Sequence, residues 1–234
     1  MNKKQMEENY QSVLCNIENA CQRSGRNPED VTLIAVSKTK PVETVKMAID
    51  IGMTEFGENK PQEIRDKTNE ISTPVKWHMI GHLQSNKIKY VLTTCELIHS
   101  IDSLKLAQQL NEQAIKKECH VNILLQVNIS KETSKQGFLA ENLEQAVREI
   151  GAMSHIHIQG FMTIAPYVEN PEDNRHLFRQ LNELLIDIKS KNIDNVNMNI
   201  LSMGMTGDYE VAIEEGATHI RVGTGLFGER NYNK

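Results

Sequence analysis

Residues 33–43, LIAVSKTKPVE, run four apolar side chains directly into Ser37 and Lys38, and reach Pro41 soon after. A short apolar run bounded by polar residues is typical of a buried strand, and a proline before a helical pattern is typical of a helix start. The stretch therefore predicts one strand followed by one helix. It also places Lys38 at the carboxyl end of that strand, where a buried charge is costly.

The same strand-then-helix unit recurs along the chain. The predicted strands cover residues 32–37, 55–57, 76–80, 97–100, 122–128, 156–162, 199–202 and 219–222. Helical patterns follow them over residues 42–51, 61–71, 86–92, 104–117, 142–151, 171–191 and 208–216. An amphipathic segment, residues 4–24, precedes them all. Eight such units predict an α/β chain that closes into a (β/α)8 TIM barrel with an extra N-terminal helix. A doubly wound open sheet stays an alternative, because periodicity does not determine closure.

Composition narrows the class of protein. The chain has 234 residues, 39% hydrophobic and 24% charged, which fits one globular domain over residues 1–234. Its apolar runs are strand-length, and the first ten residues, MNKKQMEENY, lack the apolar core of a secretory signal, so we expect a cytoplasmic protein without membrane spans. A net charge of −5 argues against a nucleic-acid surface. The helices show no sustained heptad pattern, so we expect a monomer.

Polar or glycine-rich sequence follows seven of the predicted strands. These strand ends are residues 37–38 (SK), 56–59 (FGEN), 79–87 (MIGHLQSNK), 126–130 (QVNIS), 160–166 (GFMTIAP), 201–208 (LSMGMTGD) and 221–228 (RVGTGLFG). Each could be a simple turn, since Gly, Asn and Ser form turns. In a barrel, however, all carboxyl ends of the strands meet on one face, where barrel active sites lie. Together they predict a single functional site.

Lys38 suits attack on a carbonyl group. It would share the inward face of residues 32–36 and point into the top of the barrel. Such attack needs the neutral amine, which burial or nearby positive charge favours by lowering the lysine pKa, and Lys40 and Arg221 are candidate neighbours. The alternative is a structural lysine whose ammonium reaches the barrel mouth or pairs with Glu58. The residues alone leave both open.

Glycines after the last two strands predict an anion site. Residues 223–225, GTG, follow the eighth strand, and loops after strands seven and eight commonly bind phosphate in barrels. Backbone N–H groups and the hydroxyls of Ser202 and Thr224 could hold phosphate oxygens. With a strand-end lysine, this predicts a phosphorylated carbonyl compound. A sugar phosphate in an aldolase and pyridoxal 5′-phosphate (PLP) both fit.

Several motifs together resemble the pyridoxal phosphate homeostasis protein family. They are LIAVSKTKP (33–41), FGEN (56–59), WHMIGHLQSNK (77–87), NIS…TSKQGF (128–138), GFMTI (160–164), LSMGM (201–205) and IRVGTGLFG (220–228). They occur in order along nearly the whole chain. The resemblance implies a (β/α)8 barrel like the N-terminal domain of alanine racemase, the PLP fold type III arrangement, with PLP held as an internal aldimine on Lys38.

The resemblance also implies the other cofactor-binding residues. The implied set is Lys38, Asn59, His78, Ser202, Met203, Arg221, Gly223 and Thr224. The phosphate would be held by Ser202, Gly223 and Thr224, with Met203 alongside. Arg221 would face the pyridine nitrogen, and Asn59 and His78 would lie near the ring or the lysine. Lys135 matches a family lysine on a mobile loop, which we treat as secondary.

The histidines do not predict a metal site. His82 stands where many members of the family carry proline or another small residue. A metal pair of His78 and His82 would need both on one helix face, and they straddle a strand end. His155 and His157 share a strand face but lack a third ligand, so we expect structural roles for them.

Arg221 at the pyridine nitrogen would argue against efficient catalysis. A charged arginine can only donate a hydrogen bond, so the pyridine nitrogen would stay unprotonated. An unprotonated ring would be a weak electron sink. Racemisation also needs a second acid or base, for which Tyr167 and Tyr209 are candidates without support from spacing. In the racemase relatives that base comes from a second domain, and this chain is expected to end at Lys234 with none.

We therefore expect a non-catalytic PLP carrier. The family implies a role in vitamin B6 homeostasis: it keeps free PLP low, supplies PLP-dependent apo-enzymes and balances amino and keto acids. A weak amino-acid racemase and a Schiff-base aldolase acting on a sugar phosphate stay as alternatives. Colour separates the last from the others, because PLP bound to lysine absorbs visible light.

Overall fold

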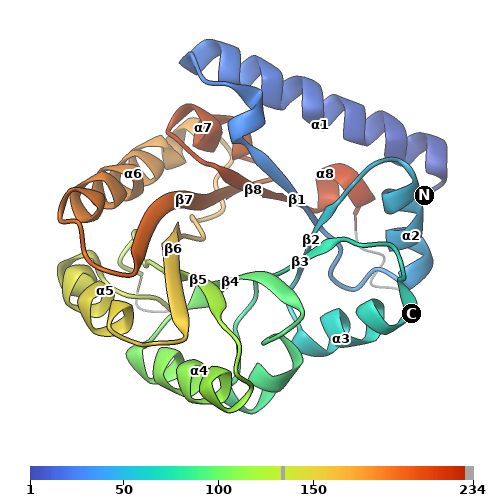
Figure 1. Ribbon diagram of the computed structural model, residues 1–234. Helices are drawn as coiled ribbons and strands as arrows, with labels where there is room; N and C mark the ends of the chain where they lie inside the picture. Colours follow the sequence, from blue (N-terminus) through green and yellow to red (C-terminus); the bar gives the residue numbers. More distant parts are fainter. Residues whose placement is uncertain (133–134, 230–234) are drawn as a thin grey trace.

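Eight parallel strands close into a barrel in chain order in the computed structural model, which describes residues 1–132 and 135–229 (Figure 1). The strands are β1 (Thr32–Val36), β2 (Glu55–Glu58), β3 (Lys76–Met79), β4 (Cys95–Ile101), β5 (Val121–Gln126), β6 (Ile156–Met162), β7 (Val196–Met205) and β8 (His219–Val222). β1 pairs with both β2 and β8, which closes the ring. The predicted TIM barrel is confirmed, and the open sheet is wrong.

Helices surround the barrel as an outer layer (Figure 1). The α-helices are α1 (Lys3–Ser24), α2 (Val42–Asp50), α3 (Pro61–Glu70), α4 (Leu104–Lys116), α5 (Leu143–Gly151), α6 (Arg175–Ser190), α7 (Tyr209–Glu214) and α8 (Thr224–Phe227). The predicted extra helix, α1, packs against α7 and α8. Its ends follow ordinary capping rules, with the Asn2 side chain accepting from the Gln5 N–H and Gly25 left-handed at the C-cap. No helix in the described ranges is long and apolar enough to cross a membrane.

Short 3-10 helices account for several differences from the sequence prediction. They are η1 (Pro28–Asp30), η2 (Ser85–Tyr90), η3 (Ala140–Asn142) and η4 (Pro171–Asn174). The helix predicted at 86–92 is η2, because so short a segment gains little from the α-helical bonding pattern. η4 takes the first turn of the helix predicted at 171–191, and α8 was not predicted. The expected chain end, residues 230–234, lies outside the described residues.

β7 is longer than the predicted strand at 199–202, and its pairing with both neighbours is irregular. Register shifts occur where it pairs with β6 and with β8. Gly160 of β6 has φ +149°, and a Cβ there would lie 1.9 Å from the Ile200 carbonyl oxygen. Glycine is therefore required where the two strands approach most closely.

The interior of the barrel is unusually polar. Most buried apolar side chains lie in the layer between strands and helices. Inside the barrel, a small separate cluster contains Leu97, Leu124 and Met162, with Ile200 packed against it. Five inward side chains from β2, β3, β4, β7 and β8 are instead polar and joined to one another: Glu55, His78, His99, Ser202 and Arg221. Barrel interiors are normally filled by branched apolar residues. A connected group of buried polar side chains therefore indicates a functional role for this part of the interior.

Candidate functional site

Lys38 lies in a tight turn directly after β1. The strand ends at Val36, and Lys38 is half-buried in the turn that follows, so its predicted strand-end position is confirmed. The Lys40 N–H donates to the Ser37 carbonyl (3.0 Å). Thr39 has φ +65°, and its N–H donates to Glu63 Oε2 (2.7 Å). A threonine in this left-handed region costs free energy, so the surrounding hydrogen bonds must hold the turn.

A buried ion pair anchors that turn to α3. Lys67 Nζ lies 2.6 Å from Glu58 Oε1 and also donates to the Ser37 carbonyl (2.9 Å). The Ser37 hydroxyl donates to the same carboxylate oxygen (2.6 Å). Burial raises the pKa of Glu58 to about 7 although Lys67 opposes the shift. Glu58, the candidate partner of Lys38 in the sequence, thus has the Lys67 ammonium and the Ser37 hydroxyl as hydrogen-bond donors.

Two backbone amides converge beside the start of α8. The N–H groups of Gly223 and Gly225 both point to the hydroxyl oxygen of Thr206, at 3.3 and 3.4 Å. A Cβ on Gly225 would lie 3.0 Å from Val222 and 3.2 Å from Thr206, so glycine leaves space at this position. We call the amides of Gly223 and Gly225 together with the Thr206 hydroxyl the glycine cup. Converging amides and a hydroxyl are suited to phosphate oxygens. Sequence reasoning missed Thr206, although its hydroxyl stands within the polar strand end 201–208.

Hydrogen bonds to the Asp208 carboxylate fix the loop that carries Thr206. One carboxylate oxygen of Asp208 accepts from the Met205 N–H (2.7 Å), and the other accepts from the Asn174 side chain (2.9 Å). Asp208 and Asn174 are both buried. The cup is therefore a built feature of the loop between β7 and α7.

Arg221 lies in the barrel interior, on the strand that leads to Gly223. It is 5% exposed and donates to Ser202 Oγ (2.6 Å) and to the Thr163 carbonyl (2.8 Å). Burial lowers the pKa of Arg221 to about 10, which still leaves the guanidinium charged at neutral pH. Because β8 pairs with β1, Arg221 lies on the strand next to β1, which leads into the turn of Lys38.

The predicted phosphate residues fall in different places. The Ser202 hydroxyl is fully buried between Arg221 and His99 Nδ1 (2.9 Å). The Met203 side chain is fully buried in the layer between barrel and helices, so its backbone alone could contribute. Gly223 is in the cup, and Thr224 is exposed at the first position of α8. The structure thus adds Thr206 as the hydroxyl nearest the amides.

His78 and Asn59 differ in depth. His78 is 2% exposed, and its two ring nitrogens contact Glu55 Oε2 (2.7 Å) and His99 Nε2 (3.0 Å), deep in the barrel. Asn59 is half-buried just after β2, and its backbone lies so close to Gly81 that a Cβ there would be 2.5 Å from the Asn59 oxygen. Of the two, Asn59 is therefore nearer to the carboxyl ends of the strands.

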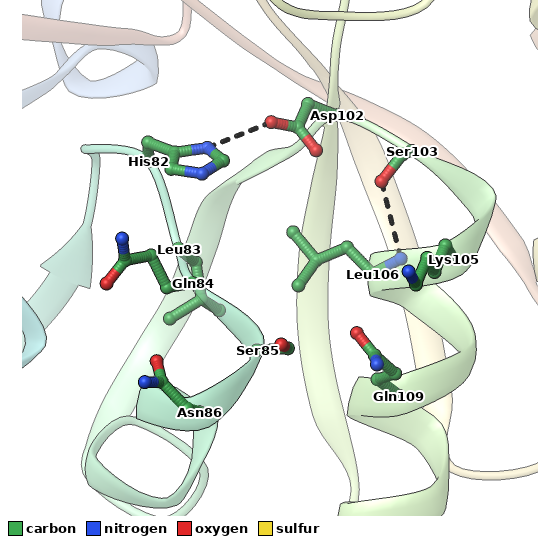
Figure 2. Close-up of a pocket in the computed structure, with 10 residues that line it drawn as sticks. All are labelled: His82, Leu83, Gln84, Ser85, Asn86, Asp102, Ser103, Lys105, Leu106 and Gln109. Atoms are coloured by element: carbon green, nitrogen blue, oxygen red, sulfur yellow. Dashed lines mark hydrogen bonds and ion pairs between the residues drawn. The ribbon is translucent and has the colours of Figure 1, made fainter.

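His82 lines a separate pocket of about 510 Å³ at the barrel rim. Figure 2 shows this pocket between the loop that leads into η2 and the start of α4. His82 Nδ1 lies 3.1 Å from Asp102 Oδ2, and Ser103, the N-cap of α4, accepts from the Leu106 N–H (3.3 Å). His82 is thus paired with Asp102 and not with His78. Within residues 1–132 and 135–229, no group of three metal-ligating side chains could hold a metal ion.

The remaining candidates lie away from the barrel interior. Tyr167 is 94% exposed, and the Tyr209 hydroxyl accepts from Asn16 of α1 (2.9 Å). Lys135 follows β5, and its ammonium lies 2.7 Å from Glu132. The rings of His155 and His157 both stack on His120.

Comparison with known proteins agrees with this geometry. Residues 9–231 match the family model described as alanine racemase, N-terminal domain. A pyridoxal phosphate homeostasis protein of Aquifex aeolicus is 41% identical over 96% of this chain and 98% of its own. PipY of Synechococcus elongatus PCC7942, solved with PLP bound, is 32% identical over 91% of this chain and 100% of its own, with a TM-score of 0.79. Alanine racemase of Clostridium difficile 630 shares the fold, at 15% identity over 97% of this chain and 58% of its own, with a TM-score of 0.75.

Proposed function

The chain belongs to the pyridoxal phosphate homeostasis protein family, and on this premise we propose that it is a PLP carrier. It binds PLP through a Schiff base on Lys38, supplies it to PLP-dependent apo-enzymes, and has no efficient catalytic turnover. One observation carries the proposal. A half-buried lysine directly after β1, a buried arginine on the neighbouring strand β8 and a glycine cup directly after β8 lie at adjacent positions of the barrel.

These three features match the three reactive parts of PLP. Lys38 would take the aldehyde carbon, Arg221 the pyridine nitrogen, and the amides of Gly223 and Gly225 with Thr206 the phosphate. Bound PLP supplies an electron sink for amino-acid carbanions. Arg221 limits that chemistry, because it stays charged and can only donate, so it leaves the ring nitrogen unprotonated.

The placement of the tyrosines favours a carrier over a racemase. Racemisation needs a second acid or base opposite the lysine. Tyr209 is turned outward to Asn16 of α1, and Tyr167 stands in solvent. Neither side chain is directed into the barrel. The same proposal includes a monomeric state, which sedimentation tests, and a cytoplasmic location, which cell fractionation tests. It also includes one PLP-binding unit over residues 1–234, which limited proteolysis tests.

The test begins with an absorbance spectrum before and after borohydride, with peptide mapping of the reduced adduct. We expect a yellow protein with the adduct on Lys38, transfer of PLP to an added apo-enzyme, and no racemisation above that of free PLP. A colourless protein that PLP cannot restore would instead favour a sugar-phosphate aldolase. Rapid racemisation of an amino acid would favour the racemase.

Thr206→Val is expected to weaken PLP binding about tenfold, because one hydrogen bond to a charged phosphate is lost without a change in shape. The dissociation constant, measured by absorbance titration, checks this. Thr68→Val is the matched control, since its hydroxyl bonds only the Ile64 carbonyl within α3. Equal affinity of the Thr206 variant and the parent protein would remove Thr206 from the phosphate site.

A further inference from the structure

A continuous chain of hydrogen bonds crosses the barrel interior and ends on Arg221. Its successive contacts are Glu55 Oε2 to His78 Nε2 (2.7 Å), His78 Nδ1 to His99 Nε2 (3.0 Å), His99 Nδ1 to Ser202 Oγ (2.9 Å) and Ser202 Oγ to Arg221 Nη1 (2.6 Å). We call these five residues the relay. Glu55, at the first residue of β2, lies at the opposite end of the barrel from the carboxyl strand ends, with 16% of its side chain exposed. The relay therefore joins the far end of the barrel to the candidate cofactor site.

The two ends of the relay fix the direction of its outer hydrogen bonds. Burial raises the pKa of Glu55, but hydrogen bonds from His78 and Lys76 outweigh it and hold the pKa below its ordinary value. Glu55 is therefore an ionised acceptor, and His78 must donate to it through Nε2. At the other end Arg221 can only donate, so Ser202 Oγ accepts from it.

The middle of the relay then has one consistent arrangement. Burial, with His78, His219 and Arg221 nearby, lowers the pKa of His99 well below its ordinary value, so His99 carries one ring proton. If Ser202 donates to His99 Nδ1, that proton lies on Nε2 and goes to His78 Nδ1. In the reverse direction Ser202 Oγ would accept from both His99 and Arg221, which leaves the Ser202 hydroxyl proton without an acceptor among its contacts. Every bond therefore points from Arg221 towards Glu55.

The titratable groups around the relay are consistent with charge at its two ends, on Glu55 and Arg221. The His219 ring on β8 lies 6.2 Å from both relay histidine rings, and burial lowers its pKa to about 4, so it is neutral at pH 7. Lys76 on β3 pairs with Glu55 (2.9 Å) at the far end. The charge of Asp208, in the loop after β7, raises the pKa of Arg221 and so favours the charged guanidinium. Hydrogen bonds that all point one way in a low-dielectric interior strengthen one another.

We propose that Glu55, His78 and His99 are positioning residues of the cofactor site, which act through Ser202 to fix the Arg221 guanidinium. The charge that a bound PLP ring meets is thus set from the opposite end of the barrel. The part that concerns PLP rests on the proposed function. The order of the protons in the relay does not.

The proton order is tested on the protein without PLP, by ¹⁵N NMR of the histidine rings. We expect His99 to be neutral and protonated on Nε2 between about pH 6 and pH 8, where an unperturbed histidine would titrate, with His78 Nδ1 as the acceptor of that proton. A proton on Nδ1 of His99 would overturn the relay as described.

The coupling to PLP is tested with two substitutions at Glu55. Glu55→Leu removes the acceptor for His78, so we expect a shifted absorbance maximum of bound PLP and an affinity about fivefold lower. Glu55→Gln keeps an oxygen that accepts from His78 and should restore both. Leu124→Ala, in the apolar half of the same interior, is the control for lost stability and should leave the maximum unchanged.

The outcomes separate the two proposals. If the parent protein binds no PLP, the proposed function fails, and the NMR measurement still decides the relay. If PLP binds and Glu55→Leu leaves its spectrum and affinity unchanged, Glu55 has no hold on the cofactor site and the inference is wrong. If Leu124→Ala shifts the spectrum as much as Glu55→Leu, the effect is general loosening of the barrel, which also contradicts it.

Discussion

Lys38→Ala is expected to abolish covalent PLP binding while the barrel stays folded. The alanine side chain has no amine to form the Schiff base, so the visible absorbance and the borohydride-trapped adduct should both disappear. The hydrogen bonds that hold the turn come from Ser37, Thr39, Lys40 and Glu63, so they survive the change. We expect the free energy of unfolding to change by no more than about 1 kcal/mol. Mass spectrometry after reduction and urea unfolding measure the two effects.

Lys40→Ala is the matched control for Lys38→Ala. Lys40 lies in the same segment, half-buried, and its ammonium contacts the Phe227 carbonyl at the end of α8 (3.0 Å). We expect it to keep the adduct at full stoichiometry. An adduct that persists at unchanged stoichiometry in Lys38→Ala would show that the assignment is wrong, and Lys40 or Lys135 would have to be mapped instead.

Lys67→Met is expected to lower the free energy of unfolding by about 3–5 kcal/mol. Lys67 and Glu58 are 5% and 0% exposed as side chains, and Glu58 Oε2 has no hydrogen-bond partner among residues 1–132 and 135–229. Removing the ammonium leaves a buried carboxyl group without its cation and frees the Ser37 carbonyl that the ammonium held. Because Ser37 precedes Lys38, the turn should also loosen. Urea unfolding of the apo protein measures the first effect.

Glu58→Gln supplies the control for Lys67→Met and a pH dependence. The folded pKa of Glu58, about 7, lies above its ordinary value of 4.5, so between these values the folded state binds more protons than the unfolded state. The contribution of Glu58 to stability is therefore fully present below about pH 4.5 and is lost as the pH rises through about 7. Glu58→Gln should lack this decline, and in Lys67→Met the decline should continue to higher pH, because Lys67 lowers the pKa of Glu58. A loss of stability in Lys67→Met that does not vary with pH would contradict a role for the buried carboxyl group.

The repeated units and the position of Lys38 could be read from the sequence because they depend on local order. Strands and helices differ in the spacing of their apolar residues, and this pattern identified all eight strands of the barrel. In parallel units each carboxyl strand end faces the same side, which is why residues 37–38 and 221–228 predicted one site. The irregular ends of β7 were missed, and η2 was predicted as an ordinary helix, since register shifts and 3-10 turns leave little trace in periodicity.

The partners of the polar side chains depended on closure of the barrel. Glu58 was a candidate partner for Lys38 in the sequence, yet it is bound by Lys67 from α3, because alternate residues of a strand face opposite sides of the sheet. The sequence offered no partners for His78, and the structure holds its ring between Glu55 and His99. Thr206 meets the amides of Gly223 and Gly225 only because β7 and β8 are neighbours.

The sequence by itself thus determined the eight strand-helix units, the lysine after the first strand and the glycines after the last, whereas closure of the barrel came from the tertiary structure. Each of these is a property of neighbouring residues. Tertiary structure decided which buried polar groups share hydrogen bonds, because a group removed from water must take the partner that the packed strands bring to it. The relay from Glu55 to Arg221, built from five strands, follows from that requirement.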